Sequence, residues 1–410
     1  MNMLLLSWRS IISKPLSSLL SWLLLTFGVL IVIMILLTSS SLKEEISKNT
    51  RGIDLVIGAK GSPLQLILAN VFHVDFPTGN INLKEAAGAS RSRYIERAIP
   101  VSLGDSYLGV RLVGTTKAYA DLYEAELGEG EWYGDHMEVV IGSEVARNLG
   151  LTIGSEFQSQ HGLSDDGDEH DAHHPFVVSG ILRPSQTVID KLILTSLQSI
   201  WEVHAHDEHH ADEDSLMTIK HLGIEVSAHH FQEEDITALL VKYRSPMGAV
   251  MLPRAINSDT NFQAASPAFE TARLFNIIGV GVDLLNMLGL LIIVISAMSV
   301  FLSLLNSLKE RRYDIAIIRS MGGTRMQIFL LVLFEGMIIT FVGAISGLVL
   351  AHVLIYALAS SLDGINPDSL SFMTEEWLVL AGCIVIGILA SMLPAFLAYK
   401  TNISETLAKG

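Results

Sequence analysis

The chain has 410 residues, of which 50% are hydrophobic and 17% are charged, with a formal net charge of −16 at pH 7. Its mean hydropathy of +0.44 lies above the range of ordinary soluble globular proteins and excludes that class. The single cysteine, Cys383, lies in an apolar run, so a disulfide-stabilised framework is excluded as well.

The N-terminal part predicts an interfacial helix followed by a membrane span. Residues 1–15 are amphipathic and contain Trp8 and Arg9, a pattern typical of a helix at the membrane surface. Residues 16–39 are apolar and long enough to cross a bilayer, which takes about 20 helical residues. Arg9 and Lys14 precede this run as they would in a signal peptide, but a small-residue cleavage site is missing. We therefore expect an uncleaved span.

Residues 40–275 form an acidic segment that is long enough to fold as one domain. It contains 18 Lys and Arg residues against 34 Asp and Glu residues. Short strand-like runs alternate with helical ones, which indicates an α+β domain. The clearest stretch is EVVIGSEVARNLGLTIGSEF, residues 138–157, which reads as strand, glycine turn, short helix, glycine and strand. Further strands are expected at residues 54–58, 109–114, 175–182 and 236–243, and helices at residues 83–92 and 195–203.

Histidine is concentrated in one part of this domain, because 11 of the 14 histidines lie between His161 and His230. Neutral imidazoles together with carboxylates suit Zn²⁺, Cu²⁺ or Ni²⁺. The spacing is loose, so a solvated acidic loop with incidental histidines is the alternative interpretation. The first cluster interrupts an expected hairpin flanked by Phe157 and Phe176. The candidate ligands are His161, His170, His173 and His174 in one group and His204, His206, His209 and His210 in a second.

A basic loop, SLKERRYDIAIIRSMGGTRMQ at residues 307–327, follows the second predicted span at residues 276–306. Gly322-Gly323 marks a turn, and Thr324 with Gln327 fits a capping box that opens the next helix. We therefore expect a helix, a tight glycine turn and a second helix that enters the bilayer.

The first helix of this loop carries an apolar patch, residues 315–318, among its charges. A basic amphipathic helix of this kind lies in the membrane interface or docks into a groove of a cytoplasmic partner. The loop is therefore a candidate functional segment.

The remaining chain predicts a third span at residues 328–360, a short external loop at 361–376, a fourth span at 377–399 and a tail at 400–410. Regularly spaced glycines line one side of the third span and suit close helix packing; they are Gly336, Gly343 and Gly347.

Three ionisable residues, Asp283, Glu335 and His352, lie within the predicted spans, where charge is costly. No second ionisable partner lies near them in sequence. We therefore expect a helix contact for Glu335 rather than a proton relay.

The charge distribution predicts the orientation in the membrane. Residues 1–15, 307–327 and 400–410 together carry nine Lys and Arg residues but three Asp and Glu residues. Short basic loops stay in the cytoplasm, whereas long loops translocate regardless of their charge. We expect both termini and the 307–327 loop inside, and the domain at 40–275 outside.

This order of one span, a large external domain and three further spans resembles the MacB/FtsX-like permeases of ABC transporters, which include lipoprotein-release and macrolide-efflux permeases. The residues that carry the resemblance are the glycine-spaced third span, residues 138–157, the run ERRYDIAIIRSMGGTRMQIFLLVLFEG at 310–336 and the run FVVSGILRPSQTVID at 176–190. The resemblance implies an α-helical membrane protein with four transmembrane helices plus an α+β extracytoplasmic domain, the MacB-like periplasmic core domain. The chain lacks the fused nucleotide-binding domain of macrolide-efflux permeases, so a separate ATPase is implied.

The resemblance also implies the function. A permease subunit of this family is not itself an enzyme and has no catalytic residues; it contacts a cytoplasmic ABC ATPase through a coupling helix. The positions that match this helix are Glu310, Arg311, Arg312, Tyr313, Asp314, Arg319, Gly322 and Gly323. ATP-driven movement of the coupling helix would be transmitted to the external domain, which exports or extracts a lipoprotein, a peptide or a lipophilic substrate.

The expected setting is the inner membrane, with lipid, a second permease subunit in a homodimer or heterodimer, and a periplasmic or outer-membrane partner. We expect no required cofactor and no nucleic-acid partner. The histidine clusters suggest Zn²⁺ binding and a link to metal homeostasis. The alternative function is a membrane-anchored metal-binding receptor or sensor without transport activity, which would have no ATPase to co-purify with it.

Overall fold

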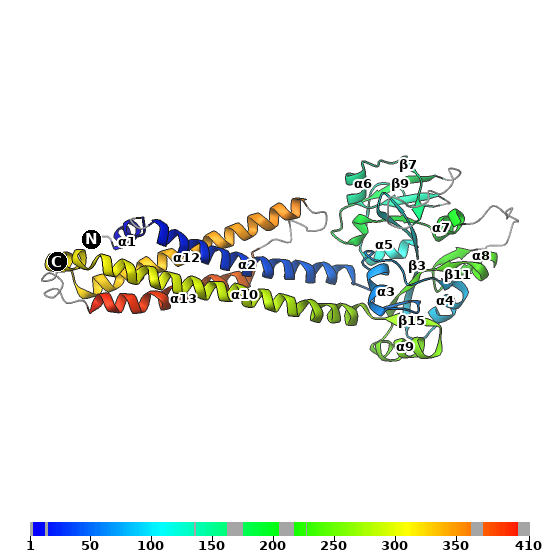
Figure 1. Cartoon of the computed structure of the whole chain (residues 1–410). Helices are drawn as coiled ribbons and strands as arrows, with labels where there is room; N and C mark the ends of the chain where they lie inside the picture. The colour runs from blue at the N-terminus through cyan, green and yellow to red at the C-terminus, as the bar shows by residue number, and fades with distance from the viewer. Residues whose placement is uncertain are drawn as a thin grey trace. The chain divides into compact units, whose positions relative to one another are not determined.

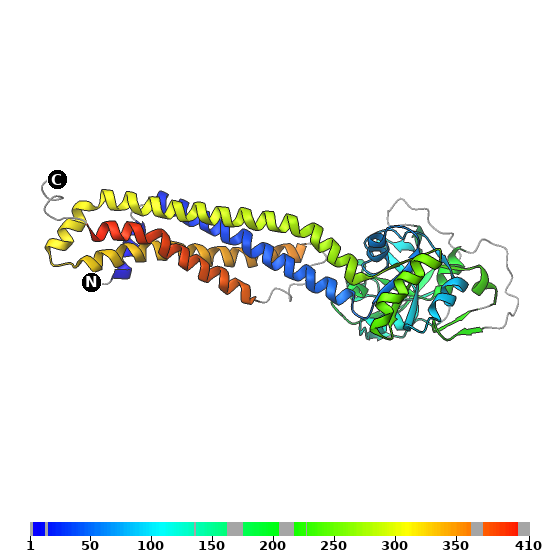
Figure 2. The same cartoon turned by 90° about the horizontal axis from the view of Figure 1, so that it is seen from below.

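The computed structural model describes residues 3–12, 15–134, 137–161, 175–204, 217–226, 228–361 and 372–400. The chain divides into two compact units. The helical unit comprises Met1–Lys43 and Ile277–Gly410, and the sheet unit comprises Glu44–Asn276. Figure 1 and Figure 2 show the elements of both units from two sides.

The helical unit is built from long apolar helices. Among the described residues, α2, α10, α12 and α13 are long and apolar enough to cross a membrane. Helices α2 and α10 extend beyond the predicted spans at 16–39 and 276–306, so the membrane boundaries stay predictions. The helices are α1 (Met3–Ile12), α2 (Pro15–Asn49), α10 (Pro267–Glu310), α11 (Arg312–Ser320), α12 (Arg325–Ser361) and α13 (Thr374–Tyr399).

Serine side chains join α2 to α10 within the helical unit. Ser17 Oγ donates to Ser303 Oγ at 2.7 Å, and Ser21 Oγ lies 2.9 Å from Ser299 Oγ. Such bonds between helices contribute to association in apolar surroundings, where an unpaired hydroxyl is unfavourable. The blue α2 and the yellow-green α10 accordingly run side by side in Figure 1 and Figure 2.

Glycines bring α12 close to its neighbours. A Cβ on Gly347 would lie 2.7 Å from the Thr26 carbonyl oxygen of α2, and a Cβ on Gly336 would lie 2.6 Å from Ser391 Cβ of α13. Gly343 also faces α2. The prediction that these glycines serve close helix packing is confirmed.

The sheet unit contains one large mixed sheet with helices on both faces. In the described part of the chain the strand order is β15-β1-β14-β3-β4-β10-β6-β9-β5, with β7 beside β9 and β8 beside β3. Strand β10 is parallel to β4 and β6 is parallel to β9. The strands are β1 (Leu55–Ala59), β2 (Ile81–Asn82), β3 (Ile95–Tyr107), β4 (Val110–Gly114), β5 (Leu127–Gly130), β6 (Glu138–Ile141), β7 (Glu156–Phe157), β8 (Gln160–His161), β9 (Phe176–Leu182), β10 (Ile193–Thr195), β11 (Met217–Ile219), β12 (Ile224–Val226), β13 (Asp235–Ile236), β14 (Ala238–Tyr243) and β15 (Phe262–Ala265).

Alternation along β1 places its side chains in two of the three hydrophobic cores that the described residues of the sheet unit form. Leu55 and Ile57 of β1 point into one core, whereas Val56 points into the other. The first core is closed by α4 and α9 and the second by α3 and α5. The helices of this unit are α3 (Pro63–Asn70), α4 (Leu83–Ser90), α5 (Lys117–Leu122), α6 (Ser143–Leu149), the 3₁₀ helix η1 (Val188–Lys191), α7 (Leu197–His204), α8 (Ala228–Glu233) and α9 (Pro246–Asp259).

The predicted fold class, four candidate membrane helices with an α+β domain, is confirmed. The hairpin expected around the first histidine cluster is also present, because β7 pairs with β9 and places Phe157 opposite Phe176. Two local predictions were wrong in detail. The helix expected from residue 195 begins at Leu197, because Thr195 ends a strand between β4 and β6. The strand expected at residues 236–243 divides at Thr237, whose Oγ1 accepts a hydrogen bond from the Leu103 N–H at 2.8 Å.

Candidate functional site

The loop between α10 and α12 contains the short helix α11, which ends in a double-glycine turn. Gly322 has a φ of +99°, a conformation that residues with a side chain rarely adopt. The N–H groups of Gly322 and Gly323 donate to the carbonyls of Arg319 at 3.1 Å and Ile318 at 3.0 Å, the two bonds of a Schellman motif. A Cβ on Gly323 would lie 2.8 Å from the Ile318 carbonyl oxygen. The predicted glycine turn is confirmed, and both of its residues require glycine.

Helix α12 begins with a capping box directly after this turn. The Gln327 N–H donates to Thr324 Oγ1 at 3.2 Å, and the Thr324 N–H donates to Gln327 Oε1 at 2.9 Å. Two amides that the helix start would leave unpaired are satisfied in this way. The predicted capping box is confirmed, and together with the glycine turn it fixes the path of the chain from α11 to α12.

The apolar patch of α11 is divided between two faces of the helix. Ile315 and Ala316 are buried, and Ile315 packs with Val300 of α10 and Ile328 of α12. Ile317 is exposed instead. Four consecutive residues surround a helix of 3.6 residues per turn, so they cannot form one surface. The apolar patch predicted at residues 315–318 is therefore not one continuous surface.

An exposed stripe of large side chains follows the outer face of α11. Tyr313, Ile317 and Met321 are 53%, 38% and 83% exposed, and their four-residue spacing places them on one side of the helix. We call these three residues the α11 stripe. Exposed apolar side chains beside basic residues form the kind of surface that docks into a groove of another protein.

Three of the charged residues predicted for this segment lie close to the stripe in sequence. Glu310 and Arg311 lie where α10 gives way to α11, and Arg319 lies in the last turn of α11. None of these three side chains is without an interaction partner. The side chains of Arg312 and Asp314 lie outside the described part of the chain.

A second candidate element is the end of α2, which is attached inside the sheet unit. Asn49, its last residue, is buried. The Asn49 side-chain oxygen accepts a hydrogen bond from the Val188 N–H at 2.8 Å, and its carbonyl accepts one from the Tyr123 hydroxyl at 3.4 Å. We call Asn49, Tyr123 and Val188 the α2 anchor. Sequence reasoning missed it, because the first span was predicted to end at residue 39.

The loop that presents Val188 is held by one buried carboxylate, Asp190. Its oxygens accept hydrogen bonds from the N–H groups of Ser185 at 2.9 Å and Gln186 at 2.7 Å, and from the Ser185 hydroxyl at 3.0 Å. A carboxylate that accepts several hydrogen bonds fixes a loop firmly. The run at residues 176–190 was singled out in the sequence, but the role of its last residue becomes visible only here.

Buried aromatic and imidazole rings support the α2 anchor from behind. The rings of Tyr123 and Tyr119 lie 5.3 Å apart, and the Tyr119 hydroxyl lies 2.8 Å from His73 Nε2. Burial, together with the positive charge of Arg111, lowers the pKa of His73 to about 3. His73 is therefore neutral at physiological pH, where its ring binds Tyr119 without bringing a charge into the core.

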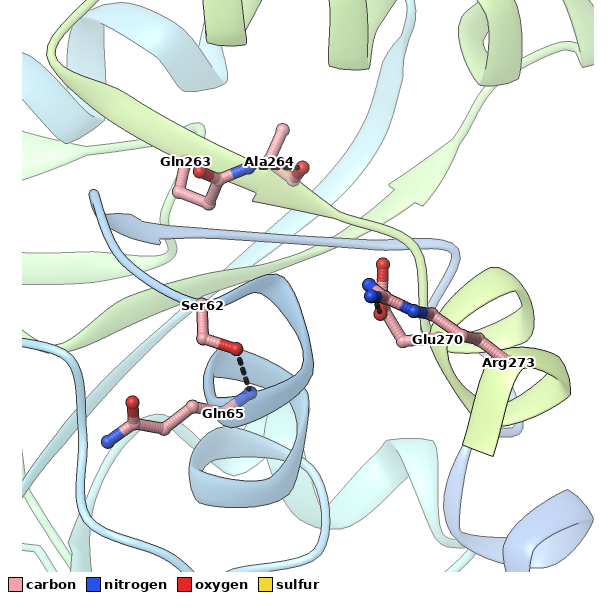
Figure 3. Close-up of polar contacts among 6 residues, drawn as sticks. All are labelled: Ser62, Gln65, Gln263, Ala264, Glu270 and Arg273. Carbon is pink, nitrogen blue, oxygen red and sulfur yellow. Dashed lines mark hydrogen bonds and ion pairs between the residues drawn. The ribbon is translucent and has the colours of Figure 1, made fainter. Parts of the chain in front are cut away.

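Helix α10 begins directly after β15, and its first residues, up to Asn276, belong to the sheet unit. Figure 3 shows Glu270 in the first turn of α10, with its carboxylate turned toward the Arg273 guanidinium at 3.7 Å. A carboxylate in the first helical turn is stabilised by the helix dipole. Thr271 Oγ1 donates to the Pro267 carbonyl at 2.7 Å within the same turn. The start of α10 is thus well defined within the sheet unit.

Comparisons with known proteins match both the sheet unit and the helical unit to families. The model of the MacB-like periplasmic core domain matches residues 18–245, more than half of the chain. The model of the FtsX-like permease C-terminal region matches residues 286–403. The chain belongs to the MacB/FtsX-like permeases of ABC transporters.

Individual relatives of the permease are distant. LolC of Haemophilus influenzae, a lipoprotein-releasing system transmembrane protein, is 26% identical over 130 residues, which are 30% of this chain and 33% of LolC. The match thus spans about a third of the length of LolC. The periplasmic region of MacB from Actinobacillus actinomycetemcomitans is 14% identical, with a TM-score of 0.35 over 56% of this chain and 98% of that one. The extracellular domain of the transporter YknZ from Gram-positive bacteria is 12% identical, with a TM-score of 0.30 over 52% and 99%.

The two candidate elements of the permease fall in different family regions. Helix α11 and its glycine turn lie in the FtsX-like region, and the α2 anchor lies in the core-domain region. The FtsX-like region lies wholly within the helical unit, whereas the core-domain region includes residues 18–43 of the helical unit as well as most of the sheet unit.

The predicted metal ligands of the permease lie mostly outside the described residues. That holds for His170, His173, His174, His206, His209 and His210. His161 ends β8 opposite Asp105 of β3, and His204 ends α7. Within the described ranges, no group of three or more His, Cys, Asp or Glu residues is arranged to hold a metal ion. Metal binding stays a prediction.

One ionisable pair in the helical unit of the permease corrects the sequence reasoning. His352 of α12 has no ionisable partner near it in sequence, but its Nε2 lies 3.6 Å from Oε1 of Glu376 in α13, and both side chains are largely buried. The Phe372 ring stacks on the His352 ring at 4.7 Å. The partner was missed because α13 begins at Thr374, earlier than the predicted span at 377–399. Acidic residues at a helix start are favourable and belong to the helix.

Proposed function

We propose that the permease couples ATP hydrolysis by a separate cytoplasmic ABC ATPase to movement of its external domain. In this proposal the α11 stripe docks into a groove of the ATPase. The observation that supports it is the division of α11 into a face that packs on α10 and α12 and an exposed face with Tyr313, Ile317 and Met321. A helix held in this way moves its own unit when a partner displaces it.

Two helices would carry this movement toward the sheet unit. A single residue, Arg311, separates α11 from α10, and α10 is one helix from Pro267 to Glu310. A displacement of α11 therefore acts directly on α10. Helix α2 ends in the α2 anchor, where Asn49 is bound to the loop that Asp190 holds. We propose that these two connections work as the mechanical link between the units.

The charge distribution and the family together suggest where each part of the permease lies and which subunits surround it. Both termini and α11 lie in the cytoplasm, the sheet unit lies outside the inner membrane, and two permease subunits form a homodimer or heterodimer with an ATPase pair. A periplasmic or outer-membrane partner receives the substrate.

The substrate class in this proposal is a lipoprotein, a peptide or another lipophilic molecule. The name of LolC as part of a lipoprotein-releasing system favours the lipoprotein. Such substrates are bound at the membrane surface, so an external domain that moves can extract them without a path through the spans.

Replacing Ile317 with glutamate tests the docking of the α11 stripe. A charge at the centre of an apolar contact is unfavourable, so we expect the amount of ATPase that co-purifies with the permease from native membranes to fall at least tenfold, or ~1.4 kcal/mol. Ile153→Glu, the same substitution at an exposed position of the sheet unit, is the control and should leave complex formation unchanged. Equal recovery of the ATPase with wild-type and Ile317→Glu permease would contradict the proposed docking.

The histidine groups have their own test. We expect the solubilised permease to bind Zn²⁺ in calorimetric titrations at pH 7.5 and to bind it more weakly below about pH 6, because imidazoles with a reference pKa of ~6.5 take up protons. Replacing His170, His173, His206 and His209 with glutamine should reduce the binding. Replacing His221, His229 and His230, which lie outside the two groups, is the control. Equal binding by both variants would identify the clusters as solvated loops.

A further inference from the structure

The sheet unit contains a cavity of about 520 Å³ whose walls come from four separate stretches of the chain. The end of α4 and the following turn form one side, and the start of β3 forms the floor. The turn between β11 and β12, part of α5 and the residue after β14 complete the walls. The cavity shares no residue with the α2 anchor, although Asp121 of its lining lies two positions before Tyr123 of the anchor.

Positive charge dominates this cavity although the surrounding domain is acidic. The residues 40–275 carry 34 acidic against 18 basic residues, yet five of those basic residues line this single cavity together with His221. The five are Arg91, Arg93, Arg97, Lys220 and Arg244. We call them the basic pocket. The carboxylates among its lining residues are Glu96 and Asp121.

Most of these charges have no ion-pair partner among the residues that the structure describes. Glu96 is already bound to Lys242 at 3.5 Å, outside the cavity lining. Within the described residues, Arg91, Arg97, Arg244 and Lys220 form no ion pair. Elsewhere in the same unit exposed arginines do have carboxylate partners, as Arg183 has in Glu126 at 2.9 Å. The domain therefore has enough acidic side chains, and a lack of them does not explain why these basic side chains have no ion pair.

The β-sheet adds a further like-charge contact at the floor of the basic pocket. Arg97 of β3 stands directly opposite Lys242 of β14 in the antiparallel register. Like charges in directly opposed positions are destabilising. Arg93 is held in place as well, because it donates to the Tyr94 hydroxyl at 2.8 Å and lies 4.9 Å from the centre of the Tyr94 ring. Several positive side chains thus lie close together and repel one another. An anion bound among them would reduce this repulsion.

We propose that the basic pocket binds a phosphate-bearing ligand. Guanidinium groups bind phosphate oxygens in pairs through their forked N–H groups, and several of them together match a multiply charged anion better than a single carboxylate. Four arginines and one lysine fit one phosphate group or two neighbouring ones. The ligand is a phosphorylated lipid headgroup or a free phosphorylated compound, which share this chemistry. This binding site goes beyond the proposed coupling function and does not depend on it.

Calorimetric titration of the full permease in a neutral detergent tests the site, with pyrophosphate as the probe. The triple variant Arg91→Gln, Arg97→Gln and Arg244→Gln should weaken binding at least tenfold. The control variant, Lys84→Gln, Arg147→Gln and Arg254→Gln, removes the same number of charges at exposed positions outside the pocket and should change the affinity less than twofold. All six side chains are exposed, and unchanged circular dichroism of both variants checks that the fold is kept.

Two further probes define the chemistry and the source of the ligand. Citrate has a similar charge without phosphorus and should bind at least fivefold more weakly than pyrophosphate. Dihexanoyl phosphatidic acid below its micelle concentration should bind more tightly than glycerol 3-phosphate if the ligand is a lipid, and equally if it is a free compound; dihexanoyl phosphatidylcholine should not bind. Absence of pyrophosphate binding, an equal loss in both triple variants, or equal binding of citrate would overturn the proposal.

Discussion

Replacing Gly323 with valine is expected to abolish the coupling of ATP hydrolysis to the permease. The Cβ would lie 2.8 Å from the Ile318 carbonyl oxygen and 3.0 Å from Ile318 Cγ2, so the turn must open. Opening it breaks the Schellman bonds that connect the end of α11 to the start of α12. The α11 stripe would then lose its fixed position relative to the bundle. We expect substrate-stimulated ATP hydrolysis by the reconstituted complex to fall more than tenfold.

A matched glycine separates this effect from a general effect on the helices. Gly382 of α13 has open space around its Cβ position, so the Gly382→Val permease should insert and support stimulated ATP hydrolysis by the reconstituted complex like the wild type. Measuring the membrane yield of both variants shows whether the Gly323→Val protein still folds. Normal stimulated ATP hydrolysis by a complex that contains a well-expressed Gly323→Val permease would show that the geometry of this turn plays no part in coupling.

Acidification is expected to loosen the core behind the α2 anchor. The pKa of His73 is about 3 in the folded protein, against 6.5 as its ordinary value. Between these two values the unfolded chain binds a proton that the folded chain does not, so stability is lost as the pH falls below 6.5. Each pH unit in this range costs ~1.4 kcal/mol, so the loss from pH 7 to pH 5 is roughly 2 kcal/mol. Above pH 7 this contribution stays constant.

Hydrogen exchange can measure this loss in the full chain. Helix α3 shortly precedes His73 and α5 contains Tyr119. The amides of both helices should lose protection roughly 30-fold between pH 7 and pH 5 after correction for intrinsic rates. His73→Gln retains a hydrogen-bonding side chain that does not titrate, and it should remove most of this dependence. His221→Gln, a substitution of an exposed histidine in the same unit, should keep it. A His73→Gln permease with the wild-type pH dependence would rule out His73 as the cause.

What could be predicted from the sequence was governed by local signals. Gly322 and Gly323 followed by Thr324 and Gln327 specify a turn and a helix start within six residues, and the structure contains both as expected. The fold class could be predicted because hydrophobic runs of membrane length and strand-like segments are also local patterns. The division of the patch at residues 315–318 was open to prediction too, because helical periodicity alone separates Ile315 from Ile317.

The α2 anchor and the basic pocket were beyond such reasoning. Asn49 is hydrogen-bonded to Val188, which lies 139 positions further along the chain. Neither the residue types nor their spacing predicts this contact. Arg97 and Arg244 lie in stretches that read as ordinary exposed strand and turn residues, and only the sheet brings them to one cavity. The His352–Glu376 pair was missed because the start of α13 was placed too late. Sequence patterns give little information about long-range pairing and about the exact ends of helices and strands.

The position of β1 has a consequence for biosynthesis. This strand is formed near the beginning of the sheet unit, yet its two neighbours are β14 and β15, the last strands of that unit. During synthesis β1 emerges with both edges unpaired, and it stays so until almost the whole domain has been made. Non-local pairing of this kind is slow and leaves apolar strands such as Leu55–Ala59 exposed to wrong partners. Nascent chains that stop before residue 238 should therefore depend on chaperones and be degraded quickly.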